Sequence, residues 1–399
     1  MKNKNKLWII GVLCVLFFAS CSTTVQVKNL LPSEVNMGAY KNLAVTSCQP
    51  FNNSIYWSHD IKGKVCSQCN LIEDFDCGED PLDSEDPVDQ SIELPSITPT
   101  SLPKSVAIYC QNALYESLDE SDFFNLTDPE TTSDMISLGE VLGNLQEIFI
   151  KKGINAILAT KITYLDYEEY LYKKDKTETD SNGDSIGKDY YLHQEVAINL
   201  SYSVIDVLQN SIITTGSMSD EEEKETLVGT YLIDDGTGSP SYTQHLNMAP
   251  ALGNLFTVCI DGFVEKIRTK LAPAWSYNSV SLMKNSPELE SVESAYKQVR
   301  KNNLMVAYKI FISAWDDERH ISSGYNAAVV LQAMGKLEES ISLMEEVYNY
   351  SGNSSIFKRL SIMRKNLEDY NEASDQISGI EKETDSQLDV FSLESFFSD

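Results

Sequence analysis

The sequence predicts an α+β fold with an antiparallel or mixed sheet and flanking helices, followed by an all-α domain of tetratricopeptide-like helical repeats. Between residues 38 and 283, apolar strand patterns are mixed with helical spacing, without the strict alternation of a doubly wound sheet. From residue 284 to 385 the spacing is helical and returns with a period of 33 residues. A chain of 399 residues is long enough for two such domains.

The first 21 residues have the order of an export signal. Three lysines precede an apolar run from Leu7 to Phe18, and small residues follow before Cys21. The run is about 12 residues long, whereas a membrane-spanning helix needs roughly 20. The stretch "LFFASC" resembles a bacterial lipobox, in which the cysteine is diacylated and becomes the new N-terminus. We therefore expect a signal peptide over 1–20, lipidation of Cys21 and a tether over 21–37. The alternative is an ordinary secretory signal with an incidental cysteine.

The charge of the chain is strongly negative. Removal of residues 1–20 takes away three lysines and no acids, so the formal charge of −29 becomes −32. Such a field disfavours binding to nucleic acid and to anionic membrane surfaces. We expect no nucleic-acid partner.

Six cysteines remain after Cys21 in a compartment that is oxidising. Disulfides are the default there, and four cysteines close together in the sequence are the candidates. Zinc bound by the same four thiolates is the weaker alternative. The four candidates are Cys48, Cys66, Cys69 and Cys77, and the other two cysteines are Cys110 and Cys259.

The first half of the α+β domain begins with a short strand at 43–45. An insertion over about 48–103 follows; its part from residue 66 to 103 has no lysine or arginine, ten acids and five prolines, so it cannot bury much apolar surface. From Lys104, apolar residues at helical spacing through Leu118 predict a helix, and "DFFNLTD" at 122–128 predicts a second strand. Residues 138–149 predict another helix, capped by Gly153.

The second half of this domain is predicted as three consecutive antiparallel strands. They are "INAILATKITYL", "HQEVAINLSYSVIDVL" and "SIITTGSMS", with a charged turn region over 174–189 and a tight turn at Gln209-Asn210. A helix over about 252–271 closes the domain.

The repeats place small, large and small residues at fixed offsets. Ala307, Phe311 and Ala314 return 33 residues later as Ser340, Met344 and Val347. Ala295 returns as Ala328, and a weaker third copy follows at Ala373, Ile377 and Ile380. Small residues let paired helices approach closely, which is typical of stacked helix pairs with a concave docking groove. A plain helical bundle is the alternative, and residues 386–399 form an acidic tail.

No motif predicts a catalytic residue, a metal site or a cofactor. The four histidines are far apart in the sequence, and no nucleophile, zinc-protease or phosphate-binding pattern occurs. Asp180, Asn182 and Asp184 imitate the start of a calcium loop, but Ser185 and Tyr191 stand where glycine and glutamate are needed. Tyrosines gather at the strand ends beside that turn, as a partner surface or as packing of an extended hairpin. They are Tyr164, Tyr167, Tyr170, Tyr172, Tyr190 and Tyr191.

The order of segments in the α+β domain resembles the periplasmic domain of curli-secretion-channel and penicillin-binding-protein-activator lipoproteins. The matching stretches are Gly153-Ile154-Asn155-Ala156 and Asp206-Val207-Leu208-Gln209-Asn210. "LAPAWSYNSVSLM" followed by helical repeats is similar to an uncharacterised family of lipoproteins of diderm bacteria. The resemblance implies an outer-membrane lipoprotein of the cell envelope. The acidic insertion departs from the pattern, and the chain has no convincing pair of membrane hairpins.

These patterns favour a lipid-anchored, non-enzymatic scaffold that binds envelope proteins or peptides through its helical repeats. An oligomeric component of an outer-membrane secretion or assembly system is the alternative, in which the α+β domain forms a homo-oligomer. An envelope hydrolase is the third hypothesis, supported only by tyrosines and scattered acids.

Overall fold

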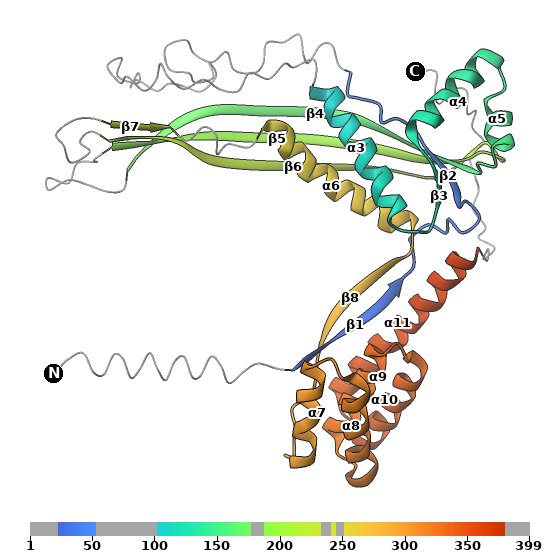
Figure 1. Cartoon of the computed structure of the whole chain (residues 1–399), viewed down its shortest axis with the longest axis vertical. Coiled ribbons are helices and arrows are strands. Elements are labelled where there is room, and N and C mark those ends of the chain that lie inside the picture. The colour runs from blue at the N-terminus through green and yellow to red at the C-terminus, as the bar shows by residue number, and fades with distance from the viewer. Residues whose placement is uncertain (1–22, 53–101, 177–186, 233–240, 245–250, 380–399) are drawn as a thin grey trace. The chain divides into compact units, whose positions relative to one another are not determined.

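The computed structural model describes residues 23–52, 102–176, 187–232, 241–244 and 251–379, which form two compact units (Figure 1). Residues 39–272 make the sheet unit, and the segments up to residue 38 and from 273 to 381 together make the helical unit. The predicted α+β class with a following helical domain is confirmed. The order along the chain is nested, because the sheet unit is inserted between two strands of the helical unit.

In the described part of the sheet unit, six strands form one mixed sheet in the order β3-β2-β4-β5-β6-β7. β2 is parallel to both of its neighbours, and the other pairs are antiparallel. The three consecutive strands β4 to β6 are confirmed, and Asn210 has the positive φ of 55° that their second turn needs. The strands are β2 (Asn42–Val45), β3 (Asn125–Thr127), β4 (Ala156–Asp175), β5 (Gly187–Asp206), β6 (Ser211–Leu232) and β7 (Ser241–Gln244).

Helices α3 (Leu102–Asp119) and α6 (Leu252–Leu271) lie side by side on one face of this sheet (Figure 1). They bury Cys110, Leu114, Phe256 and Phe263, among others, against alternate residues of β5 such as Leu200. Strands of about 20 residues are roughly 66 Å long, whereas helices of 18 to 20 residues are about 27–30 Å long. The strands therefore continue well past the helices toward β7 (Figure 1).

The opposite face of the sheet is covered near β2 by two helices, where the sequence predicts one helix over 138–149. α4 (Pro129–Leu142) ends at Gly143, which has a φ of 65°, and α5 (Leu145–Lys151) begins two residues later. The two helices pack at Gly139, where an added Cβ would lie 2.5 Å from Leu145 Cδ1. The single-helix prediction is wrong because the glycine reverses the chain, which leaves Val141 83% exposed instead of buried.

The helical unit contains a two-stranded antiparallel ribbon of β1 (Thr24–Leu31) and β8 (Ala274–Ser281). Thr24 pairs with Ser281 and Leu31 with Ala274. The predicted tether over 21–37 therefore contains a strand, and residues 274–281 belong to the helical unit rather than to the α+β domain. The tether prediction failed because the partner of β1 lies about 250 residues away, so that only the short alternation "VQV" marks the strand.

The helical repeats form antiparallel neighbours α7 (Glu290–Arg300), α8 (Leu304–Glu318), α9 (Ile321–Ala333), α10 (Leu337–Ser351) and α11 (Ser354–Ser378). Residues with a positive φ follow the helix ends, and they recur with the same 33-residue period as the repeats in the sequence. Asn302 and Gly335 lie within the pairs, and Arg319 and Gly352 lie between them. α7 with α8 and α9 with α10 are thus the predicted helix pairs.

The predicted third copy is one continuous helix and not a pair. Glu368 stands where Asn302 and Gly335 turn the chain in the earlier copies, and glutamate favours helix there. Ala373 is buried as predicted, Ile377 is exposed, and Ile380 lies outside the described residues.

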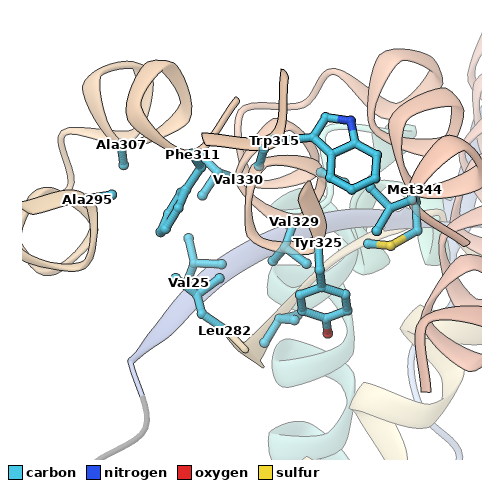
Figure 2. Close-up of a cluster of buried hydrophobic side chains, with 14 of the residues drawn as sticks. Val25, Leu282, Ala295, Ala307, Phe311, Trp315, Tyr325, Val329, Val330 and Met344 are labelled. Atoms are coloured by element: carbon cyan, nitrogen blue, oxygen red, sulfur yellow. The ribbon is translucent and has the colours of Figure 1, made fainter. Parts of the chain in front are cut away.

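One apolar core joins the ribbon to the helices (Figure 2). Val25 and Leu282 lie in the same cluster as Phe311, Trp315 and Val329, together with the repeated small residues. Full burial of each large apolar side chain contributes roughly 1.5–3 kcal/mol, so the ribbon is part of the core and not an appendage. Among the described residues, none of the helices combines the length and the apolar character that a membrane span requires.

Candidate functional site

The ribbon lies on the face formed by the first helices of the pairs. β1 contacts α7, α9 and α11, which alternate with α8 and α10 along the chain. On the ribbon, Val25, Val27 and Val280 point into the core of the helices. Packed between α8, α10 and the ribbon, α9 has every residue from Ser322 to Gln332 buried. This face of the helical repeats is therefore covered by the chain's own strands.

The end of β8 is fixed to this face by side-chain groups that bond its backbone. The Asn326 amide accepts from Met283 N–H at 2.7 Å and donates to the Met283 carbonyl at 2.9 Å. The Tyr296 hydroxyl donates to the same carbonyl at 2.6 Å, and burial raises the pKa of Tyr296 to about 12, so it stays protonated. The backbone N–H and the backbone carbonyl of Met283 thus both have hydrogen-bond partners inside the helical unit.

The other end of the ribbon is fixed in the same way. The Gln376 amide oxygen accepts from Ser33 N–H at 2.9 Å, and its amide nitrogen donates to the Ser33 carbonyl at 3.0 Å. The two amides, which we call the Asn326 and Gln376 clamps, hold chain segments that lie just after β8 and just after β1. Neither clamp was predicted from the sequence, because a polar residue within a helix gives no indication of which distant backbone group it will bond.

The outer side of the ribbon carries an exposed aromatic surface. Trp275 and Tyr277 alternate with inward residues on β8 and are 50% and 66% exposed. Lys28, which pairs with Tyr277, places its Nζ 3.8 Å from the Trp275 ring centroid. We call Lys28, Trp275 and Tyr277 the ribbon face. The signal in the sequence was "AWSYNSVS", whose alternate aromatic residues mark one side of a strand.

The sheet unit has a polar surface where its strands pass beyond α4 and α5. His193 of β5 is buried among carboxylates of both strands, 3.8 Å from Glu195 and 3.6 Å from Glu223. His193, Glu223 and Glu225 have ligand atoms within 4.8 Å of one another, a spacing that a metal ion could use. Glu225 also lies 3.7 Å from Lys174. Only the register of the β5–β6 hairpin brings these groups together, so no sequence motif marks them.

The predicted tyrosine cluster is divided between the two faces of the sheet. Tyr164 donates to Asp166 at 2.9 Å on one face, whereas Tyr167 is half-buried on the other. Tyr190 is buried and its neighbour Tyr191 lies on the opposite face, 5.0 Å from Lys174 Nζ. The side chains of Tyr170 and Tyr172 lie outside the described residues.

The candidate disulfide residue Cys48 is a buried thiol beside Cys110 of α3. A hydrogen bond between the two thiols lowers the pKa of Cys48 and raises that of Cys110. Cys66, Cys69 and Cys77 lie outside the described residues, as do Cys21 and the calcium-like turn at 180–184. The disulfides predicted among the first four cysteines stay a prediction, and the structure adds Cys110 as a neighbour that the sequence did not indicate.

The one serine–histidine contact within the described ranges is structural. His320 Nδ1 lies 2.7 Å from Ser323 Oγ, the contact that a hydrolase nucleophile needs. Both residues are buried, and the other ring nitrogen lies 2.8 Å from the Pro287 carbonyl. This pair holds the segment before α7 against α9 and offers no surface to a substrate. His59 and His245 lie outside the described residues.

Comparisons with known proteins give no family. No protein-family model and no curated protein matches the chain. Two solved structures of the PelC dodecamer from Paraburkholderia phytofirmans are similar at 8% identity, with TM-scores of 0.23 and 0.22. Each match covers 61% of this chain, and 96% and 97% of the respective PelC chain. A superposition this loose assigns neither a family nor a function.

Proposed function

We propose that the chain is a non-enzymatic scaffold of the bacterial cell envelope, anchored in the outer membrane by acylation of Cys21. Its partner is another envelope protein, which binds the ribbon face and not a groove between the helices. The lipobox-like stretch supports the anchor, and two or more acyl chains give stable attachment. The ribbon covers the face formed by α7, α9 and α11, which supports placing the partner on the ribbon face and not in a groove between these helices.

The exposed aromatic pair on the ribbon is the observation that carries this proposal. Tryptophan and tyrosine are the residues that most often dominate protein interfaces, because they bury a large area at a low entropy cost. Trp275 and Tyr277 are held rigidly, since the clamps and the core fix the strand beneath them. In the described part of the chain, the ribbon has two strands, so each strand also has an outer edge that can pair with an extended segment.

The anchor is tested with a Cys21→Ala variant of the full chain in its bacterial host. We expect the loss of the acyl mass by mass spectrometry and the release of the protein from the membrane fraction. A variant that keeps both would show that Cys21 is not the anchor. Ser22→Ala serves as the control and is expected to change neither.

The binding surface is tested by placing a photo-crosslinking amino acid at residue 277 in intact cells. We expect one defined envelope protein to be crosslinked there and not at residue 350, a second exposed tyrosine of the same unit. Trp275→Ala is expected to reduce the crosslink at 277 by about tenfold or more, as for an aromatic anchor. Equal crosslinks at 277 and 350 would contradict the ribbon face. Deletion of residues 284–385 is a poor test, because it removes the core on which the ribbon rests.

The oligomeric alternative meets an electrostatic obstacle at the open edge of the sheet. In the described strands, β7 pairs only with Gly229–Leu232, so the earlier part of β6 has β5 as its one strand neighbour. That edge carries Asp220, Glu221, Glu222, Glu223 and Glu225. Edge-to-edge pairing of two copies would bring like charges together. Light scattering of the non-acylated chain at micromolar concentration is expected to give a monomer, and a ring-sized mass would favour the alternative.

A further inference from the structure

The hairpin of α7 and α8 has an unusual charge distribution for so acidic a chain. Residues 294–315 contain four cations and no acid, although the whole chain has a net charge of −29. Lys297, Arg300 and Lys301 are exposed near the turn between the helices. The acids of α7 lie in its first turn, and those of α8 lie at its end. Because the two helices run in opposite directions, the turn end of the hairpin is basic and the other end is acidic.

Exposed apolar side chains lie at the same end. Met305 and Val306, in the first turn of α8, are 47% and 48% exposed. We call Lys297, Arg300, Lys301, Met305 and Val306 the α7–α8 surface. Basic and apolar residues together on one end of a hairpin are typical of surfaces that lie in the headgroup region of a bilayer.

This surface lies next to the point where the chain leads to Cys21. Arg300 Nε donates to Thr23 Oγ1 at 3.3 Å, and Leu282 N–H donates to the Thr23 carbonyl at 2.8 Å. Thr23 is thus fixed both to α7 and to the ribbon. Two residues span at most about 7 Å, so an acylated Cys21 keeps Thr23 and Arg300 close to the membrane.

We propose that the α7–α8 surface is a second membrane contact, which binds anionic phospholipid headgroups beside the lipid anchor. The cations meet the lipid phosphates, and Met305 and Val306 enter the boundary between headgroups and acyl chains. The inference builds on the anchor proposed above. It gives the helical unit a defined orientation, because its basic end faces the bilayer and its acidic end faces away.

The test uses residues 21–399 with Cys21→Ala, so that binding is measured without any acyl chain. Flotation is carried out with vesicles of phosphatidylcholine alone and of an equimolar mixture with phosphatidylglycerol. We expect the chain to float with the mixed vesicles at low salt and only weakly with phosphatidylcholine. Arg300→Glu with Lys301→Glu should weaken binding at least about tenfold, and Met305→Ser with Val306→Ser should weaken it as well.

The matched control is Lys266→Glu with Lys358→Glu, which makes the same change in net charge on α6 and α11. It is expected to bind like the parent chain. Absence of parent binding, or an equal loss in both charge-reversed variants, would overturn the proposal. A failure of acylation at Cys21 in cells would be read separately by mass, so the anchor and this surface can fail independently. Circular dichroism of each variant confirms that a loss of binding is not a loss of folding.

Discussion

The two units are stabilised in different ways, the sheet unit mainly by backbone hydrogen bonds and the helical unit mainly by side chains. In the sheet unit, β4 to β6 are held by long backbone ladders between strands that follow one another. In the helical unit, the ribbon joins segments about 250 residues apart, and two side-chain amides hold its ends. Single substitutions should therefore disturb the helical unit far more than the sheet unit. The difference also separates roles, since the surfaces proposed for partner and membrane both lie on the unit that depends on side chains.

The largest effect is expected at Trp315, which is buried against α9. An added Cβ at Gly324 would lie 2.7 Å from its ring, which shows how tightly the indole fills the space between helices. Trp315→Ala should lower the unfolding free energy of the helical unit by about 3–5 kcal/mol. Hydrogen exchange read by mass, peptide by peptide, should show faster exchange in α7–α11 and unchanged exchange in β4–β6.

The control for this variant is Tyr350→Ala, which removes an exposed ring that meets Trp315 edge to face, with 5.5 Å between the ring centroids. A loss of only about 0.5–1.5 kcal/mol is expected. If exchange in the sheet unit accelerated equally in Trp315→Ala, the two units would unfold together and the comparison would fail.

A smaller effect concerns the sheet unit and its two adjacent thiols. In protein from an oxidising compartment, we expect a disulfide between Cys48 and Cys110, formed by exchange with an oxidised dithiol protein. One thiolate attacks the oxidised dithiol to form a mixed disulfide, and the second then displaces the dithiol protein in its reduced form, which closes the bond. The bond should stabilise the sheet unit by about 2–4 kcal/mol relative to the reduced form. This disulfide would link distant segments of the sheet unit through side chains, as the two amide clamps do in the helical unit.

Peptide mapping without reductant measures this linkage directly. Cys259 is the internal control, since burial and the nearby Asp220 raise the pKa of its thiol to about 11, and it should stay reduced. A bond from Cys48 to Cys66, Cys69 or Cys77 would instead support the pairing that the sequence alone suggested.

The third prediction concerns the helical unit and removes the Asn326 clamp. Asn326→Ala leaves the N–H and carbonyl of Met283 without this partner in a buried place, at a cost of about 1–3 kcal/mol. Asn326→Asp accepts from the N–H but cannot donate to the carbonyl, so it should rescue little. Urea denaturation gives the free energy, and hydrogen exchange of residues 280–287 shows whether the end of β8 is released. An unchanged exchange rate there would mean that the core alone holds the ribbon.

The smallest effect is a pH dependence of the sheet unit at Glu169. Burial raises the pKa of this carboxyl, although the Gln194 amide donates to it at 2.6 Å. A folded pKa above the unfolded value means that stability is full at low pH and falls as pH rises through the interval between the two values. Glu169→Gln should remove that slope and raise stability at neutral pH by up to about 1 kcal/mol. Glu168→Gln on the exposed neighbour is the control, and an equal change there would show a general effect of charge.

Much of the sheet unit could be predicted because its pattern is local. The long strands alternate over many residues, and α6 has its apolar residues at helical spacing, so periodicity alone gives their type and the bounds of α6. The bounds of the strands were predicted too short, because β4 continues to Asp175, β5 begins at Gly187 and β6 continues to Leu232 through charged residues that were read as a turn or left unassigned. The α4–α5 hairpin escaped prediction because Leu138, Val141 and Leu142 are apolar but exposed. A pattern assigns apolar residues to the core, and the turn at Gly143 moved these three to the surface.

The helical unit shows where sequence reasoning ends. The 33-residue period predicted the pairs correctly, and the replacement of glycine by Glu368 explains why α11 does not turn. β8 was not predicted as a strand, since its largest side chains point outward while two of its four inward positions, Ser276 and Asn278, are polar. The residues of the clamps and of the α7–α8 surface have their roles because they contact segments far away in the chain. Their neighbours in the sequence form no pattern that would predict those contacts.

The insertion of the sheet unit between β1 and β8 sets an order of events during synthesis and folding. β1 is synthesised first, but its partner strand follows only after all of residues 39–272. Closing so long a loop in an unfolded chain has an entropic penalty of about 5 kcal/mol, which falls once the intervening unit has folded and brought its two ends together. The sheet unit is thus expected to act as a folding template in cis. During that interval the apolar side of β1 stays unpaired, and this is the period when a chaperone would be of most use to the chain.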